Sequence, residues 1–256
     1  VFKAYALELF AFQYKYNAVY HEFCSLLKKT PEQVQTIEDI PFLPISFFKT
    51  HQVITQMPFE PATAFSETKS IDKKKASAFC FTSSGTTGSE TSKHYVPDLS
   101  LYEASYMTAF EIFYGPVENY CVLALLPAYL EREGSSLIYM AEDLIAKSGH
   151  PQSGFYLHNH EALYKTLLEL ESKNTPVFLI GVSFALLDFS EKYSMSLKNT
   201  IVMETGGMKG RRKEMIREAL HENLTKGFGV SKIHSEYGMT ELLSQAYSNG
   251  DGIFNT

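Results

Sequence analysis

Nine residues near the first third of the chain read Phe81-Thr82-Ser83-Ser84-Gly85-Thr86-Thr87-Gly88-Ser89. They follow directly on the apolar run at residues 78–81, which predicts the end of a strand. Glycine lets the backbone turn tightly and approach a ligand closely, and the hydroxyl groups add neutral donors beside exposed backbone N–H groups. A strand that leads into such a loop is a candidate polyphosphate site, although a Ser/Thr/Gly cluster taken alone is more often a solvated loop.

The loop differs from the common nucleotide-binding signatures. A P-loop needs G-x-x-x-x-G-K-[ST], whereas here Gly88 follows Gly85 after only two intervening residues and the next lysine is Lys93. A second motif lies far downstream, where Ser235-Glu236-Tyr237-Gly238-Met239-Thr240-Glu241 follows the strand-like residues 232–234. The alternative interpretation of this second motif is an ordinary turn in which Thr240 and Glu241 begin a helix.

Together, the two motifs resemble the phosphate loop and the adenine and magnesium motif of the adenylate-forming superfamily, which contains acyl-CoA ligases, luciferases and peptide-synthetase adenylation domains. Within it, the chain is most similar to the LuxE-type acyl-protein synthetases of fatty-acid reductase complexes. Phenylacetate-CoA ligases look similar as well. Three further stretches carry the subfamily resemblance: Ile40-Pro41-Phe42-Leu43-Pro44-Ile45-Ser46-Phe47-Phe48-Lys49, Ser92-Lys93-His94, and Gly206-Gly207-Met208-Lys209-Gly210-Arg211.

The resemblance implies that backbone and hydroxyl groups of the first loop hold the β- and γ-phosphates of ATP, and that Thr86 acts in catalysis. Lys93 would add a positive charge there, but the family lysine lies nearer the second glycine than Lys93 does. His94 is either a catalytic residue or a structural cap. The phosphate-binding residues of the loop are Ser83, Ser84, Gly85, Thr86, Thr87 and Gly88.

The resemblance assigns the second motif to the nucleotide and the metal. Tyr237 and Gly238 would lie beside adenine, Thr240 would contact the α-phosphate, and Glu241 would be the magnesium ligand, with Thr240 and Glu241 also catalytic. Mg²⁺ prefers carboxylate and phosphate oxygens, which suits Glu241. Gly206 and Gly207 would form a flat wall against the adenine.

For three further side chains near these motifs, two alternative roles are considered. Lys209 and Arg211 either reach a phosphate or carboxylate or begin a surface helix. Tyr129 either lies near the substrate carboxylate or packs at the rim of the core.

The function that the resemblance implies is ATP-dependent activation of a carboxylic acid, in this subfamily a fatty acid, to an acyl-adenylate for transfer to a protein cysteine thiol. Such catalysis consists of positioning the phosphates and neutralising growing charge. ATP and Mg²⁺ are the implied cofactors, and an acyltransferase or reductase protein is the implied partner. Two alternatives stay open: an acyl- or aryl-CoA ligase, and a non-catalytic nucleotide- or acyl-binding module.

A hydrolase is the competing enzyme class. Gly181-Val182-Ser183-Phe184-Ala185 follows a predicted strand and approaches the G-x-S-x-G nucleophile elbow, but its last position is alanine. No aspartate and histidine pair stands out downstream. In the adenylate-forming fold, a similar segment lines the acyl pocket.

Strand and helix patterns alternate along the chain, which predicts an α/β fold with a largely parallel sheet flanked by helices. Because ligands bind at the carboxyl ends of parallel strands, both motifs are expected to meet over one crevice. The resemblance implies that residues 1–256 form most of a nucleotide- and acyl-binding N-terminal domain, without the family's small C-terminal domain. Helices are expected at 1–29, 100–114, 135–148, 160–172, 184–193 and 208–220, and strands at 120–126, 154–158, 177–181, 200–203 and 232–235.

Amino-acid composition argues against several other classes of protein. A net charge of −6 argues against a nucleic-acid-binding surface. Three scattered cysteines, Cys24, Cys80 and Cys121, fit a reducing compartment better than a disulfide framework, so a cytoplasmic location is expected. The longest apolar run, residues 176–187, is too short to span a bilayer.

Overall fold

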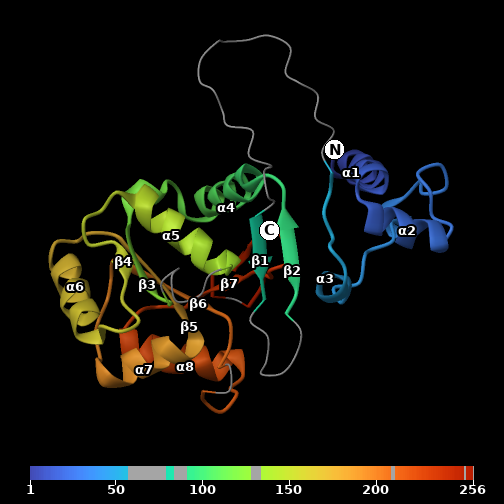
Figure 1. Ribbon diagram of the computed structural model, residues 1–256. Helices are drawn as coiled ribbons and strands as arrows, with labels where there is room; N and C mark the ends of the chain where they lie inside the picture. The colour runs from blue at the N-terminus through green and yellow to red at the C-terminus, as the bar shows by residue number, and fades with distance from the viewer. Residues whose placement is uncertain (57–78, 84–90, 128–133, 209–210, 251, 256) are drawn as a thin grey trace, which may run out of the picture. The chain divides into compact units, whose positions relative to one another are not determined.

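The computed structural model describes residues 1–56, 79–83, 91–127, 134–208, 211–250 and 252–255. Ser84, Gly85, Thr86, Thr87 and Gly88 therefore lie outside the described residues, as do Tyr129 and Lys209. The chain divides into two compact units, Val1–Leu99 and Ser100–Thr256, and each unit is described by itself (Figure 1).

The N-terminal unit begins with two helices, α1 (Phe2–Tyr16) and α2 (Ala18–Leu26), where the sequence predicted one helical region. Asn17 separates them because its side chain accepts a hydrogen bond from the Tyr20 N–H (3.1 Å) and caps α2. The short helices η1 (Ile37–Asp39) and α3 (Phe47–Thr50) follow. A small core of Phe10, Cys24 and Val34 holds the helices together.

The strand before the first loop is β1 (Phe79–Thr82), and it pairs with β2 (Lys93–Val96) as an antiparallel hairpin. The expectation that this strand belongs to the parallel sheet is therefore wrong. Only ten residues of sequence, 83–92, separate the two strands, and short connections join antiparallel strands, whereas a parallel crossover requires roughly a dozen or more residues and usually a helix.

The C-terminal unit is an α/β structure around a six-stranded sheet of order β4-β3-β5-β6-β7-β8. All neighbouring strands are parallel except β7 and β8, so the predicted fold class is confirmed as a mostly parallel sheet flanked by helices. The strands are β3 (Cys121–Leu125), β4 (Gly154–Phe155), β5 (Val177–Val182), β6 (Thr200–Thr205), β7 (His234–Tyr237) and β8 (Ala246–Ser248). The helices are α4 (Leu99–Tyr114), η2 (Val117–Asn119), α5 (Ser136–Ser148), α6 (His160–Ser172), α7 (Ser183–Lys192) and α8 (Arg217–Phe228).

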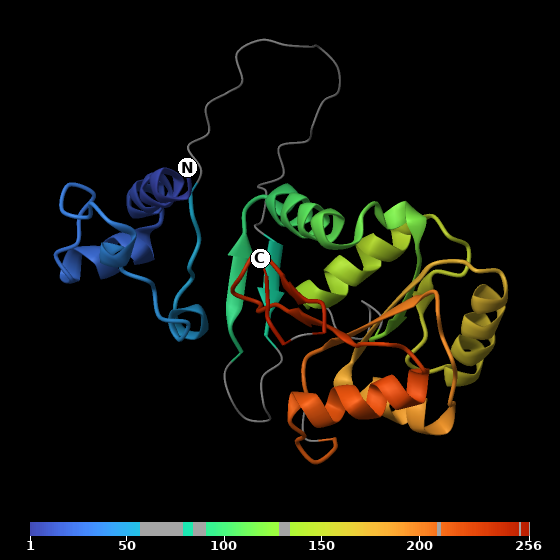
Figure 2. The ribbon, with the colours of Figure 1, turned by 180° about the vertical axis from the view of Figure 1, so that it is seen from behind.

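Helices cover both faces of this sheet. Figures 1 and 2 show α4 and α5 over one face and α7 and α8 over the other. Every residue of β3 and β5 is buried, as continuous apolar strands with both faces covered require. The ring of Phe110 on α4 packs edge-on against Phe178 of β5, with 5.0 Å between the ring centroids.

The predicted helix at 208–220 is displaced, because α8 begins only at Arg217. Arg212 is bound to α7 by hydrogen-bonded ion pairs with Asp188 (Nε to Oδ1, 2.8 Å) and Glu191 (Nη1 to Oε1, 2.8 Å). This tertiary contact holds the segment against α7, and it overrides the helix propensity of the arginine, lysine and glutamate residues there.

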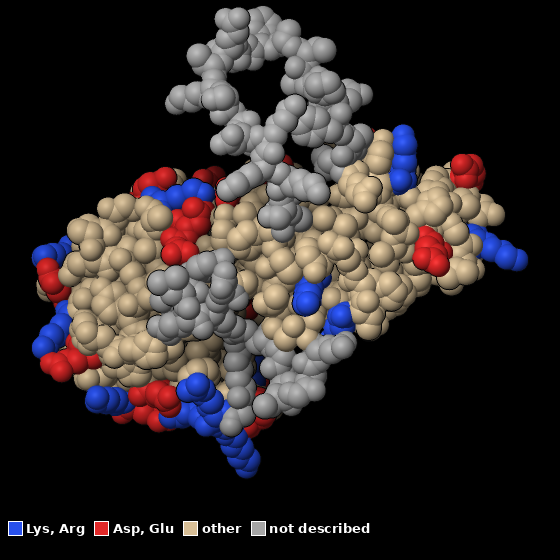
Figure 3. All heavy atoms as spheres, viewed as in Figure 1, with Lys and Arg blue, Asp and Glu red and all other residues tan. Residues whose placement is uncertain are grey.

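Charged side chains of both signs lie next to one another along the rim of the C-terminal unit (Figure 3). Several form helical i,i+4 pairs, such as Lys165 with Glu161 and Lys226 with Glu222. No helix in the described part of the chain is long and apolar enough to cross a membrane.

Replacing Gly229 by alanine is expected to lower the free energy of unfolding by about 3 kcal/mol. Gly229 ends α8 in a left-handed conformation (φ +65°), and a Cβ there would lie 2.4 Å from the Met195 carbonyl oxygen. Gly149, which ends α5 at φ +63°, is the matched control, because its Cβ would meet nothing within 4 Å.

Gly149→Ala should therefore cost only the left-handed strain, about 1 kcal/mol. Urea unfolding of the two variants measures the difference. Equal losses would mean that the backbone at Met195 moves away without cost.

Candidate functional site

The parallel strands β5, β6 and β7 end at one edge of the sheet. Val182 pairs with Thr205, and Thr205 pairs with Glu236, so these three strand ends lie at the same level. Gly206-Gly207 follows β6, and the segment 238–241 follows its neighbour β7. The structure thus brings Gly206 and Gly207 together with the second motif, at the carboxyl ends of the strands where α/β proteins bind ligands.

The backbone at the carboxyl end of β6 has free space beside it. Gly206 adopts φ +73°, which favours glycine, and a Cβ on Gly207 would meet nothing within 4 Å. Gly238 is constrained instead, since a Cβ there would lie 2.8 Å from Oε1 of Glu236. Thr240 and Glu241 follow in a turn and are partly buried.

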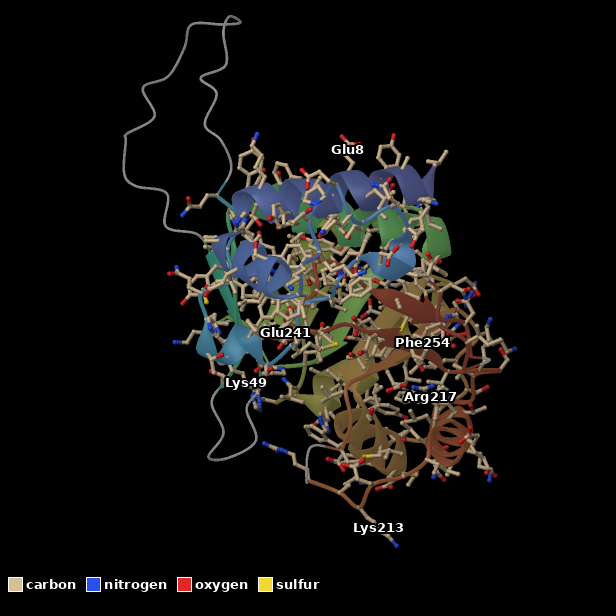
Figure 4. All side chains as sticks on the ribbon, turned by 90° about the vertical axis from the view of Figure 1, so that its right-hand side faces the viewer. Glu8, Lys49, Lys213, Arg217, Glu241 and Phe254 are labelled. Carbon is tan, nitrogen blue, oxygen red and sulfur yellow. The ribbon has the colours of Figure 1, made fainter. Side chains whose placement is uncertain are left out.

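Tyr237 carries the exposed aromatic surface of this edge. Its side chain is 52% exposed, and its hydroxyl donates to the Met239 Sδ (3.0 Å). Phe254 lies edge-on to Tyr237, with 6.1 Å between the ring centroids. The Arg217 guanidinium lies 4.9 Å from the centroid of the Phe254 ring. Phe254 and Arg217 are neighbours in Figure 4. Phe254 was missed from the sequence because it lies outside both motifs.

The described residues of the first motif belong to the N-terminal unit. The Ser83 Oγ accepts a hydrogen bond from the Ser92 N–H (2.9 Å), which extends the β1–β2 hairpin. Lys93 is exposed at the start of β2. His94 packs edge-on against Phe48 of α3, with 5.3 Å between ring centroids. The meeting of the two motifs over one crevice stays a prediction.

A buried polar network lies beneath the site on the α7 and α8 side of the sheet. Ser183 Oγ donates to Glu204 Oε2 (3.0 Å), and His221 Nε2 lies 3.6 Å from Glu204 Oε1. The same His221 nitrogen lies 3.3 Å from Ser235 Oγ. Burial raises the pKa of Glu204, but the contacts with His221, Ser235 and Ser183 outweigh burial and leave that pKa below its usual value.

A second buried network lies on the opposite face, because neighbouring residues of a strand point to opposite sides. The Thr205 hydroxyl donates to Oε2 of Glu236, and Gln245 Nε2 donates to the Tyr102 hydroxyl (2.9 Å). Burial raises the pKa of the Glu236 carboxyl to about 7; the Thr205 hydrogen bond opposes this shift, and the charge of Glu204 adds to it. Glu236 stands in the second motif but received no role there, and Glu204 lies outside both motifs, so sequence analysis missed both networks.

The nucleophile-elbow interpretation of Ser183 does not fit this geometry. Ser183 is 1% exposed, and its hydroxyl donates to the carboxylate of Glu204, with the Gly206 carbonyl at 3.4 Å. In a catalytic triad the histidine lies between serine and acid, whereas here the carboxylate lies between Ser183 and His221. The arrangement is that of a structural network.

The arginines after β6 have different surroundings. Arg212 is bound by α7, whereas Arg211 is exposed and places its guanidinium 5.1 Å from the ring of Phe184. Lys213 projects away from the rest of the unit in Figure 4. Among the described residues, no group of three or more His, Cys, Asp or Glu side chains is arranged to hold a metal ion.

Comparison with known proteins identifies no relative: no family model, no curated protein and no solved structure matches this chain.

Proposed function

We propose that this protein activates a carboxylic acid with ATP, forming an acyl-adenylate, and that the acid is a fatty acid destined for a protein cysteine thiol. The observation that carries the proposal is the adjacency of β6 and β7. Their parallel pairing puts Gly206-Gly207 and the segment from Tyr237 to Glu241 at one edge of the sheet. Both carry the sequence pattern of the adenylate-forming superfamily.

The residues at this edge suit a nucleotide. The open backbone at Gly207 leaves room for a flat ring, and the half-exposed Tyr237 offers an aromatic surface. In this proposal Thr240 contacts the α-phosphate, and Glu241 would hold Mg²⁺, an ion that prefers carboxylate oxygen. The ion would supply charge neutralisation for the phosphates. Residues 83–88, with Lys93 and His94, would hold the β- and γ-phosphates.

The reaction needs little covalent help from the protein. A carboxylate oxygen of the acid forms a bond to the α-phosphorus, and the bond from the α-phosphorus to the bridging oxygen breaks, so that pyrophosphate leaves with that electron pair. The protein holds the two reactants in line and stabilises the negative charge that develops. A thiolate then attacks the acyl carbon, and AMP leaves.

The decisive experiment is pyrophosphate release with ATP, Mg²⁺ and a panel of fatty and aryl acids, together with direct detection of the acyl-adenylate. Pyrophosphate release that depends on an acid supports the proposal. Thr86→Val in the first loop should lower the rate about tenfold or more, because one phosphate contact is lost. ATP binding without an adenylate from any acid would exclude the synthetase and favour a non-catalytic module.

The acceptor is decided by a second pair of assays. Labelled acyl groups should appear on a protein thiol without coenzyme A, in the presence of a cysteine-containing acyltransferase or reductase partner. Formation of acyl-CoA on addition of coenzyme A would favour the CoA ligase instead.

A further inference from the structure

Glu236 occupies a special place in the candidate site, directly before Tyr237 and opposite Thr205. Thr205 in turn directly precedes Gly206-Gly207. The hydrogen bond from the Thr205 hydroxyl to Glu236 Oε2 therefore joins the ends of the two strands that carry the proposed adenine-binding residues. The other carboxyl oxygen, Oε1, lies 2.8 Å from the position that a Cβ on residue 238 would take, so the carboxyl group is also close to the backbone just after β7.

The surroundings of Glu236 hold no positive charge among the described residues. The side chain is 6% exposed, and the titratable groups near it are Tyr102 on α4, Tyr247 on β8 and, on the other face of the sheet, Glu204 of β6. Burial raises the pKa of both tyrosines, so they stay neutral. A buried carboxyl group without a positive charge beside it holds its proton to higher pH than an exposed one, and in that form it acts as a neutral hydrogen-bonding group.

Glu204 provides the contrast within the same sheet. It is equally buried, but Ser183, Ser235 and His221 surround it and favour its charged form. The surroundings of Glu204 thus lower its pKa, whereas those of Glu236 raise its pKa. Of the two glutamates, Glu236 is the one whose charged form the fold disfavours.

We propose that Glu236 is a positioning residue: its carboxyl group, hydrogen-bonded to Thr205, fixes the two strand ends so that Gly207 and Tyr237 flank the adenine of ATP. This inference rests on the proposed function. Loss of the Glu236 proton would place a negative charge next to the site. This charge would repel the phosphates of ATP and disturb the positions of the two strand ends, so we expect the affinity for ATP to fall when Glu236 is deprotonated.

The test compares ATP affinity of the wild type, Glu236→Gln and Glu236→Leu from pH 5.5 to pH 8.5. The titration of ATP itself cancels when affinities are expressed as ratios between proteins. The wild type and Glu236→Gln should bind equally up to about pH 6, and the wild type should then weaken about tenfold relative to Glu236→Gln by pH 8.5. Glu236→Leu lacks the hydrogen bond and should bind about tenfold more weakly than Glu236→Gln at every pH.

Unfolding curves over the same variants give a second readout. The pKa of Glu236 is higher in the folded protein (about 7) than in the unfolded chain (4.5), so its stabilising proton is fully present below pH 4.5 and is lost as the pH rises to about 7. The unfolding equilibrium constant of the wild type should therefore increase roughly 100-fold relative to Glu236→Gln across this window. Glu118→Gln, on an exposed residue, is the control and should follow the wild type.

The outcomes separate this inference from the proposed function. A constant affinity ratio between wild type and Glu236→Gln, or equal affinities of the glutamine and leucine variants, overturns the role of Glu236 while ATP binding stands. Absence of ATP binding by the wild type contradicts both, and the unfolding curves then still show whether Glu236 links the strand ends.

Discussion

Replacing Glu241 by glutamine is expected to reduce acyl-adenylate formation by about 100- to 1,000-fold while leaving the fold intact. Glu241 lies in the turn after β7 and is only partly buried, and no described residue forms an ion pair with it (Figure 4). Within the described part of the chain, its carboxylate thus forms no ion pair that the amide would remove. In the proposed reaction it is the protein's ligand for Mg²⁺, and an amide oxygen is a weaker ligand for this hard cation.

Two measurements and a control variant test this expectation. The rate of pyrophosphate release is measured at increasing Mg²⁺, and the unfolding midpoint is measured in parallel. Glu218→Gln, an exposed position at the start of α8, is the matched control and should retain the wild-type rate. A Glu241→Gln variant with wild-type rate and wild-type dependence on Mg²⁺ would exclude Glu241 as the metal ligand.

Replacing His221 by leucine is expected to lower the free energy of unfolding by about 3–5 kcal/mol. His221 extends from α8 to Glu204 and Ser235, which belong to neighbouring strands. Its loss leaves the buried Glu204 carboxylate with fewer partners, and an incompletely paired buried charge is costly. Ser235→Ala removes a neutral hydroxyl from the same network and should cost only about 1 kcal/mol.

Two further results distinguish a buried-charge penalty from lost packing. The double variant Glu204→Leu with His221→Leu should recover much of the stability, because no charge remains to be buried. The pKa of Glu204 is lowered in the folded protein, so its stabilisation is present above 4.5 and is lost as the pH falls. The difference between His221→Leu and wild type should therefore shrink in acid. A difference that is independent of pH would point to packing alone.

Local pattern was sufficient for most of the helices and strands of the C-terminal unit, although it displaced α8 and did not predict β8. Continuous apolar runs predicted β3 and β5, and the spacing of Tyr102, Tyr106 and Phe110 predicted α4, because strand and helix periodicities are properties of neighbouring residues. Glycines after β6 and β7 likewise marked the edge of the sheet where the candidate site lies.

Contacts between distant residues decided the rest. The partner of β1, and the non-helical course of residues 211–216 beside α7, depend on segments that no local pattern identifies. The two buried networks also depend on contacts between distant residues. Glu204 and Glu236 are both glutamates near the end of a strand, yet strand register places Glu204 beside His221 and Ser183, and Glu236 beside Thr205. A protonation state follows from the groups that surround a carboxyl in space, and only the tertiary structure determines those groups.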